Sequence, residues 1–259
     1  MKERNPFLWK LQSNTDSDSY LFGTMHISEG KDVDKLRLVK DKIDECNYFA
    51  TEMDLGQRSL MDTNSFHLDT SLSTKMNANH YKRCRKILLR SFDVDLNVIG
   101  ILKPLIITNM IAEVVLGKTG CIGLDQYLYN YAAEAEKDLG GVEKVSEQGD
   151  IMNRIPLDYQ IKALRSIAKN PKSFRRNVLK MNELYRKGDL RRLHKKAKRS
   201  LGKMRKPLLY DRNIIMAQRI RHMITEQSSF IAIGAGHLSG GKGVLRLLIQ
   251  SGIKVSRVH

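Results

Sequence analysis

Two histidines stand in matching positions, each three residues after a glycine that ends an apolar run. One motif is G-T-M-H (23–26) after Tyr-Leu-Phe, and the other is G-A-G-H (234–237) after Phe-Ile-Ala-Ile. Such runs predict buried strands, and glycine permits the chain to turn tightly where a strand ends. Parallel strands present their C-terminal ends at one sheet edge, where α/β proteins bind ligands. We therefore expect His26 and His237 to meet there and to bind a divalent metal ion.

A carboxylate is expected at the same edge. Glu52 lies at the C-terminal end of the strand predicted for Tyr48–Met53. A lone histidine after an apolar strand is more often a packed core residue, and Glu52 has the alternative of a structural or capping carboxylate. Two histidines in equivalent positions with a nearby Glu make a functional site an equal alternative to packing.

Strand and helix patterns at both ends of the chain predict the framework that positions these residues. A strand ending at His26, a helix capped by Asp32 or Asp34, and the strand 48–53 form a βαβ unit with a parallel pair of strands. The C-terminus repeats the pattern with strand 229–234, helix 243–251 and strand 253–258. The predicted fold class is α/β, with a central, mostly parallel sheet.

The middle of the chain reads mainly as helix. We expect one domain, 1–259, in which a large helical insertion at about 56–225 separates the two halves of the sheet. Residues 56–95 are expected to be irregular, with at most two short helices, and to be followed by a buried helix 99–116 that kinks or starts near Pro104. A helix 124–139, stopped by Gly140 and Gly141, leads to a strand 142–145. Helices are expected over 156–227, with breaks near Pro171, Gly188 and 202–207.

Composition indicates a folded protein with an uneven positive charge. The chain has 259 residues, 41% of them hydrophobic, and a formal net charge of +17. Residues 160–206 contain 18 Lys and Arg but only Glu183 and Asp189 as acids. This segment is either a solvated helical face or a surface for an anionic partner, such as nucleic acid, an anionic membrane or an acidic peptide. Few aromatic side chains are available there for base stacking, only Phe174 and Tyr185.

The remaining sequence signals favour a cytoplasmic protein. The N-terminus shows no secretory leader, and charged and polar residues interrupt the most apolar window, 98–116, so no transmembrane segment is expected. Cys46, Cys84 and Cys121 are odd in number and widely spaced, which favours buried apolar cysteines over disulfides or a zinc site.

The motifs together resemble the TraB/GumN family, which includes the TIKI proteins. The resemblance runs from about residue 7 to 258, and the paired Gly-x-x-His motifs are its most specific part. The matching pieces, in order, are F-L-W-K-L (7–11), Y-L-F-G-T-M-H (20–26), T-E-M-D-L (51–55), G-L-D-Q-Y-L (123–128), G-V-E-K-V (141–145) followed by E-Q (147–148), G-D-L (188–190), R-N (212–213) and G-A-G-H-L-S-G-G-K-G-V-L (234–245).

The resemblance implies a fold related to the erythromycin-esterase and ChaN-like group, and a metal-dependent peptidase or amide hydrolase. His26, His237 and Glu52 would bind the metal, which is Mn, Co, Fe or Zn. Glu143 would be a ligand or general base, and Arg212 would hold a substrate carboxylate or an oxyanion. The substrate, a peptide or protein, would be bound by Arg212, Asn213, Gly23, Gly234 and Gly236.

Each role has an alternative. Glu143 lies in Val-Glu-Lys where the family often shows Leu-Glu-Thr, and it has the alternative of a surface pair with a Lys. Arg212 has the alternative of a helix-surface ion pair, and Asp125 is better explained as a helix cap. The whole protein has two further interpretations, a non-catalytic module that binds a pheromone-like peptide and an adaptor that docks on anionic surfaces through 160–206. The histidines without a matching motif, expected to be bystanders, are His67, His80, His194, His222 and His259.

Overall fold

The computed structural model describes residues 5–13, 17–25, 33–60, 66–117 and 122–258. They divide into two compact units. One unit comprises residues 1–60, 122–145 and 183–259, and the other comprises 61–121 and 146–182. The first contains the sheet and every described residue of the candidate site, and the second is helical. The single domain stays a prediction.

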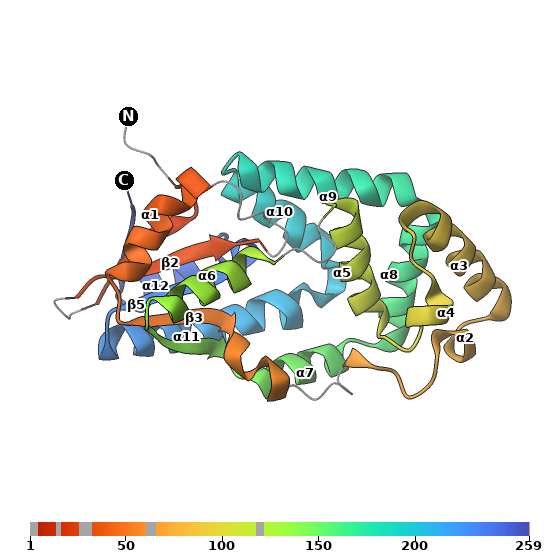
Figure 1. Cartoon of the computed structure of the whole chain (residues 1–259), viewed down its shortest axis with the longest axis horizontal. Coiled ribbons are helices and arrows are strands. Elements are labelled where there is room, and N and C mark those ends of the chain that lie inside the picture. Colours follow the sequence, from red (N-terminus) through yellow and green to blue (C-terminus); the bar gives the residue numbers. More distant parts are fainter. Residues whose placement is uncertain (1–4, 14–16, 26–32, 61–65, 118–121, 259) are drawn as a thin grey trace. The chain divides into compact units, whose positions relative to one another are not determined.

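The sheet has six strands in the order β4-β3-β5-β2-β1-β6 (Figure 1). The four strands from β4 to β2 are parallel, whereas β1 runs antiparallel to both β2 and β6. The α/β class with a mostly parallel sheet is therefore confirmed. The strands are β1 (Leu8–Gln12), β2 (Ser19–Thr24), β3 (Tyr48–Met53), β4 (Asp138–Glu143), β5 (Ser229–Gly234) and β6 (Lys254–Arg257).

The central strands are apolar because helices cover both faces of the sheet (Figure 1). All six residues of β2 are buried, and so are the first five of β5. Phe49 and Phe230 stack with ring centroids 5.8 Å apart. The covering helices are α1 (Val33–Asp44) and α6 (Leu124–Glu134) on one face, and α11 (Asp211–Glu226) and α12 (Val244–Gln250) on the other.

The first βαβ unit differs from expectation in one respect. β2 and β3 are parallel, but they do not pair with each other, because β5 lies between them. Thr51 of β3 pairs with Ala232 of β5, and Thr24 of β2 pairs with Gly234. A crossover helix can connect two strands that have a third strand between them. Here the third strand is β5, the most apolar strand of the C-terminal half, which lies at the centre of the sheet. The consequence is that Gly234 lies between the ends of β2 and β3.

The bounds of one predicted helix and one predicted strand differ from the structure. The expected helix 124–139 ends at Glu134, and the strand expected at 142–145 is β4, which begins at Asp138 and contains both glycines. Gly140 does not stop a helix; it leaves room for the Tyr48 hydroxyl, which would lie 1.9 Å from an added Cβ. β1 was not predicted at all, because its alternation is interrupted by half-buried Trp9 and Lys10.

The helical unit is more regular than its polar sequence suggested. Residues 56–95, expected to be irregular, include the 15-residue helix α3 (Ala78–Phe92), whose buried residues Tyr81, Cys84, Leu88 and Phe92 recur at helical spacing between cations. Pro104 begins α5 as predicted. The other helices that lie at least partly in this unit are α2 (Leu72–Lys75), α4 (Leu96–Ile99), α5 (Pro104–Val115), α7 (Val145–Arg154), α8 (Leu157–Lys169) and α9 (Pro171–Arg186).

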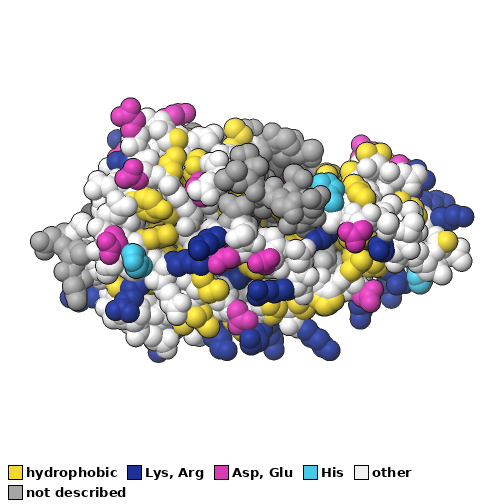
Figure 2. All heavy atoms as spheres, turned by 90° about the horizontal axis from the view of Figure 1, so that it is seen from below, with side chains coloured by type: hydrophobic (Ala, Val, Ile, Leu, Met, Phe, Trp, Pro, Cys, Tyr) yellow, Lys and Arg dark blue, Asp and Glu magenta, His cyan; other side chains and the backbone are white. Residues whose placement is uncertain are grey.

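The remaining helical predictions hold. Helices fill 157–226 with breaks at the expected places, and Gly188 and Gly202 have positive φ angles of 70° and 51°. α10 (Leu190–Ser200) lies between these glycines, and the π-helical turn η4 (Lys206–Tyr210) leads into α11. Within the described ranges, no helix is long and apolar enough to cross a membrane. Figure 2 shows Lys and Arg side chains spread over one face, with Asp and Glu among them.

The cysteines match their expected character where the structure describes them. Cys46 and Cys84 are buried and free. Burial raises the pKa of Cys46 to about 12 and that of Cys84 to about 11, so both thiols stay protonated at neutral pH. Cys121 lies outside the described residues.

Candidate active site

Glu52 connects the ends of two neighbouring strands. It is the penultimate residue of β3, and its Oε2 accepts a hydrogen bond of 3.1 Å from the backbone N–H of Gly234, the last residue of β5. The parallel pairing of β3 with β5 brings these two residues to the same sheet edge. A Cβ at Gly234 would make a tight contact, 3.3 Å from Glu52 Oε2. The carboxylate is therefore fixed at the place predicted for it.

Arg212, near the start of α11, lies between two carboxylates. Its Nε donates to Glu143 Oε1 at 2.8 Å, and its Nη2 donates to Glu143 Oε2 at 2.7 Å and also to Glu52 Oε1. Only 15% of the Arg212 side chain and 2% of the Glu143 side chain are exposed. Burial alone would lower the pKa of Arg212, but the two carboxylates outweigh it and raise the pKa above its ordinary value.

This geometry differs from the surface alternatives for both residues. Glu143 is buried and pairs with Arg212, and Arg212 is buried between two carboxylates. The trio contains two carboxylates and one guanidinium, so its own formal charge is one negative unit when all three are ionised. A net negative charge in a largely buried setting attracts a cation or a proton.

His237 is held in one orientation by Asn213. The imidazole is buried, and its Nδ1 lies 2.6 Å from Asn213 Oδ1. The Asn213 amide is itself oriented, since its Nδ2 donates to the backbone carbonyl of Lys242 at 2.6 Å. Asn213 Oδ1 therefore accepts, which assigns a proton to His237 Nδ1; in the neutral ring the lone pair is then on Nε2. Nε2 lies 4.0 Å from Glu52 Oε1, too far for a hydrogen bond.

The described residues thus bring together five side chains and one backbone N–H from distant parts of the sequence. The side chains are those of Glu52, Glu143, Arg212, Asn213 and His237, and the N–H is that of Gly234. His26 lies outside the described residues, so its meeting with His237 stays a prediction. β2, the strand that leads toward it, pairs with β5 up to Thr24 opposite Gly234. Among described residues alone, no group of three or more His, Cys, Asp or Glu is arranged to hold a metal.

Of the other two glycines of the motifs, Gly23 is needed for close packing and Gly236 is not. A Cβ on Gly23 would lie 2.5 Å from Leu238 Cδ1, so β2 needs glycine to approach the turn η5 (Ala235–His237). The Gly23 carbonyl accepts a 2.8 Å hydrogen bond from the Tyr185 hydroxyl, and burial raises the pKa of Tyr185. At Gly236 an added Cβ would make only ordinary contact, at 3.7 Å from Ala197.

His194 was expected to be a bystander, yet its ring lies against the loop that contains His237. Its Nδ1 is 3.0 Å from the Gly236 carbonyl, and its Nε2 would be 2.5 Å from a Cβ on Gly240, whose φ is 96°. The signal was present in the sequence, since Leu190, Leu193 and His194 form one buried face of α10. A polar residue on such a face needs a partner in the interior.

Asp125 also differs from its expected role. The N-cap of α6 is Gly123, and no side chain makes a capping hydrogen bond there. Asp125 instead lies inside the first turn and is 9% exposed. Burial, and then the charge of Asp125, raise the pKa of Tyr185.

Comparison with known proteins identifies the family. A model of the TraB/PrgY/gumN family matches residues 7–257. The chain belongs to this family. TraB/PrgY/gumN membership agrees with the resemblance carried by the sequence motifs, and the match covers every residue of the candidate site, including His26.

Several curated relatives of this TraB/PrgY/gumN chain carry the name Metalloprotease TIKI. TIKI1 of Danio rerio is 26% identical over 58% of this chain and 37% of its own length. TIKI1 of Xenopus tropicalis is 24% identical over 97% of this chain and 61% of its own length. TIKI1 of Homo sapiens is 26% identical over 58% of this chain and 36% of its own length. The chain thus spans little more than a third of the length of the first relatives it matches. No solved structure matches it.

Proposed function

We propose that this protein is a metal-dependent hydrolase of peptide or other amide bonds, with its reaction centre at the sheet edge formed by β3, β5 and β2. The names of its TIKI relatives support protease-like chemistry that needs a metal. The observation that carries the proposal is the arrangement of His237 and Glu52. An imidazole lone pair and a carboxylate oxygen face each other at 4.0 Å, outside hydrogen-bond range.

The donor set fits a divalent metal ion. Neutral imidazole nitrogen and carboxylate oxygen suit Mn, Co, Fe and Zn, and an outer hydrogen bond to the other ring nitrogen is typical of a metal-bound histidine. Asn213 makes that bond to His237 Nδ1. We propose His237, Glu52 and His26 as the ligands. When bound, the metal would polarise the scissile carbonyl and acidify a water molecule.

The residues of the trio take distinct roles in this proposal. Glu52 Oε1, which lies 4.0 Å from His237 Nε2 and also accepts from Arg212 Nη2, is the proposed acceptor of a proton from the attacking water. Glu143 accepts two hydrogen bonds from Arg212, and we propose that it positions that guanidinium. Arg212 retains its charge at any accessible pH and can stabilise an oxyanion or a substrate carboxylate.

The proposed contribution of Gly23 and Gly234 is close packing of the backbone. The N–H and the carbonyl of Gly23 are hydrogen-bonded to the Phe7 carbonyl and to Tyr185. The N–H of Gly234 is used by Glu52, and the Gly236 carbonyl by His194. These groups are not available to a substrate, and the Asn213 amide is engaged by His237 and Lys242, so the proposed substrate contact is assigned to Arg212.

The proposal is tested by activity that depends on metal and on these side chains. Metal-stripped protein is incubated with a peptide library, alone and with Mn, Co, Fe or Zn, and products are identified by mass spectrometry. We expect products only with metal, and none for His237→Ala or Glu52→Gln. His222→Ala, on the exposed face of α11, is the matched control. Binding of peptides without any products would favour the non-catalytic binding module instead.

A further inference from the structure

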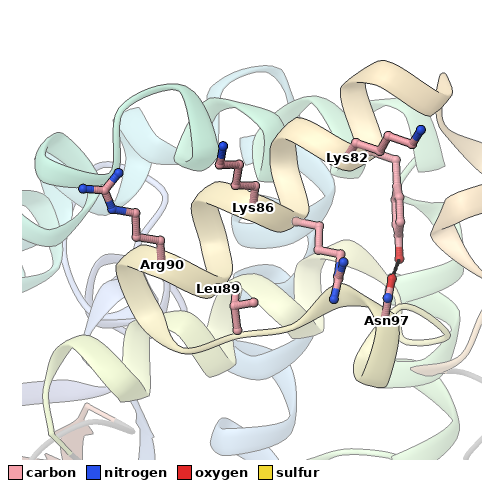
Figure 3. Close-up of a pocket in the computed structure, with 7 residues that line it drawn as sticks. Lys82, Lys86, Leu89, Arg90 and Asn97 are labelled. Carbon is pink, nitrogen blue, oxygen red and sulfur yellow. Dashed lines mark hydrogen bonds between the residues drawn. The ribbon is translucent and has the colours of Figure 1, made fainter.

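A cationic groove lies on the helical unit, apart from the residues of the candidate site. It has a cavity volume of about 680 Å³ and lies along α3 and the start of α4. α3 carries five Lys and Arg and no Asp or Glu. Figure 3 shows Lys82, Lys86 and Arg90 extending from α3, and Leu89 facing the chain that connects α3 to α4. The residues that line the groove are Tyr81, Lys82, Arg85, Lys86, Leu89, Arg90 and Asn97.

Three of these cations have no anionic partner within the described residues. Lys82, Lys86 and Arg90 are exposed and appear in none of the ion pairs there. Arg85 differs, because its Nε and Nη2 bind Asp95 at 2.6 and 2.9 Å. In the groove, Arg85 is therefore paired with Asp95. Beside it, Lys82, Lys86 and Arg90 form a row of cations that have no ion pair with any described residue.

The spacing of Lys82, Lys86 and Arg90 along α3 indicates what kind of ligand the groove can bind. Lys82, Lys86 and Arg90 recur every fourth residue, which on a helix is a repeat of about 6 Å. Same-side residues of an extended chain repeat at about 6.8 Å, so alternate carboxylates of one extended segment can pair with successive cations. We propose that the groove binds an acidic, extended segment of a polypeptide.

Apolar surface in the groove favours a polypeptide over a nucleic acid. Leu89, which lines the groove, is 38% exposed. It offers contacts to apolar side chains between the carboxylates of the ligand. Tyr81 is 8% exposed and donates to Asn97 Oδ1 at 3.0 Å, so the one aromatic ring of the groove provides no base-stacking platform. The hollow shape also favours a segment of chain over a flat bilayer.

The experiment measures binding of a fluorescein-labelled peptide of repeating Glu-Leu-Glu-Ser units by anisotropy at low salt. We expect the triple variant Lys82→Gln, Lys86→Gln, Arg90→Gln to bind about tenfold more weakly, because three charge contacts are lost. The matched control is Arg191→Gln, Lys195→Gln, Arg199→Gln, which removes three exposed cations at the same spacing from α10. The control should retain binding. Circular dichroism verifies that both variants are folded.

Three results would overturn the proposal. Equal loss in both triple variants would mean that net charge alone attracts the peptide. Unchanged binding in the groove variant would mean that the peptide binds elsewhere. Tighter binding of duplex DNA, or of vesicles with anionic lipid, with the same dependence on Lys82, Lys86 and Arg90 would assign the groove to that ligand. Leu89→Ser adds a separate test, since it should weaken binding of the peptide without changing the charge of the groove.

Discussion

Arg212 donates two parallel hydrogen bonds to Glu143, of 2.8 and 2.7 Å, and its Nη2 also donates to Glu52. The three side chains come from α11, β4 and β3, so this contact joins the edge of the sheet to the helix that also presents Asn213. The arrangement fixes Glu52 beside His237 before any ligand arrives.

The first prediction concerns the stability of this trio. Arg212→Met should destabilise the protein by about 3–5 kcal/mol, because two carboxylates lose their shared partner in a half-buried setting. Urea unfolding measures the loss. Arg221→Met, an exposed position on the same helix, should change the free energy of unfolding by less than about 0.5 kcal/mol. Similar losses in the two variants would mean that the trio contributes no special stability.

The second prediction concerns Asn213 as the residue that orients His237. Asn213→Leu should lower metal affinity by about 10–100-fold, because the Nδ1 proton loses its acceptor. Asn213→Asp keeps an acceptor and should bind metal far better than Asn213→Leu. Competition titration with a chelating dye gives the affinities. Equal affinity in both variants would contradict the orienting role, provided that both remain folded.

A third prediction concerns His194, whose Nδ1 bonds to the Gly236 carbonyl. His194→Phe should cost about 1–3 kcal/mol, because a buried carbonyl loses its donor. Hydrogen exchange should accelerate chiefly in the backbone of 234–243. His194→Gln keeps a donor and should recover part of the protection. Faster exchange spread evenly over the sheet would argue that His194 merely fills space in the core.

A fourth prediction follows from the Arg85–Asp95 pair in the helical unit. Hydrogen bonds from Arg85 and then from the Asn97 backbone N–H lower the pKa of Asp95 from 3.8 to about 2. A carboxyl group with a lowered pKa in the folded state stabilises above its unfolded pKa, and this stabilisation is lost as pH falls through the folded value. Wild type should therefore exceed Asp95→Asn in melting temperature at about pH 5. This difference in melting temperature should shrink between pH 3.8 and about 2. A difference that does not change with pH would contradict the pairing of Arg85 with Asp95.

Strand patterns in the sequence predicted the positions of Glu52 and of the second histidine motif, because these residues end apolar strands, whereas Glu143 and Arg212 were predicted from the family resemblance. Glu52, Gly234 and His237 could be placed from strand periodicity, since parallel strands share an edge. The direct contact of Glu52 with Gly234 could not, because it depends on β5 inserting between β2 and β3. Strand order is set by long-range packing, which leaves no local pattern in the chain.

The errors have similar physical causes. Gly140 and Gly141 resemble a helix stop in sequence, but they belong to a strand that must accommodate Tyr48. The sequence did not predict the full length of α3, because cations lie between the apolar residues that form its buried face. His194 was overlooked because no motif marks it, although its position on the buried face of α10 identifies it in retrospect.

The most direct test of the central claim is anomalous diffraction from crystals soaked in Mn²⁺. The account predicts one strong peak in contact with His237 Nε2 and Glu52, with the imidazole of His26 completing the contact. A fully loaded crystal whose only Mn²⁺ peaks lie away from His237, with Glu52 and Arg212 unchanged, would contradict it.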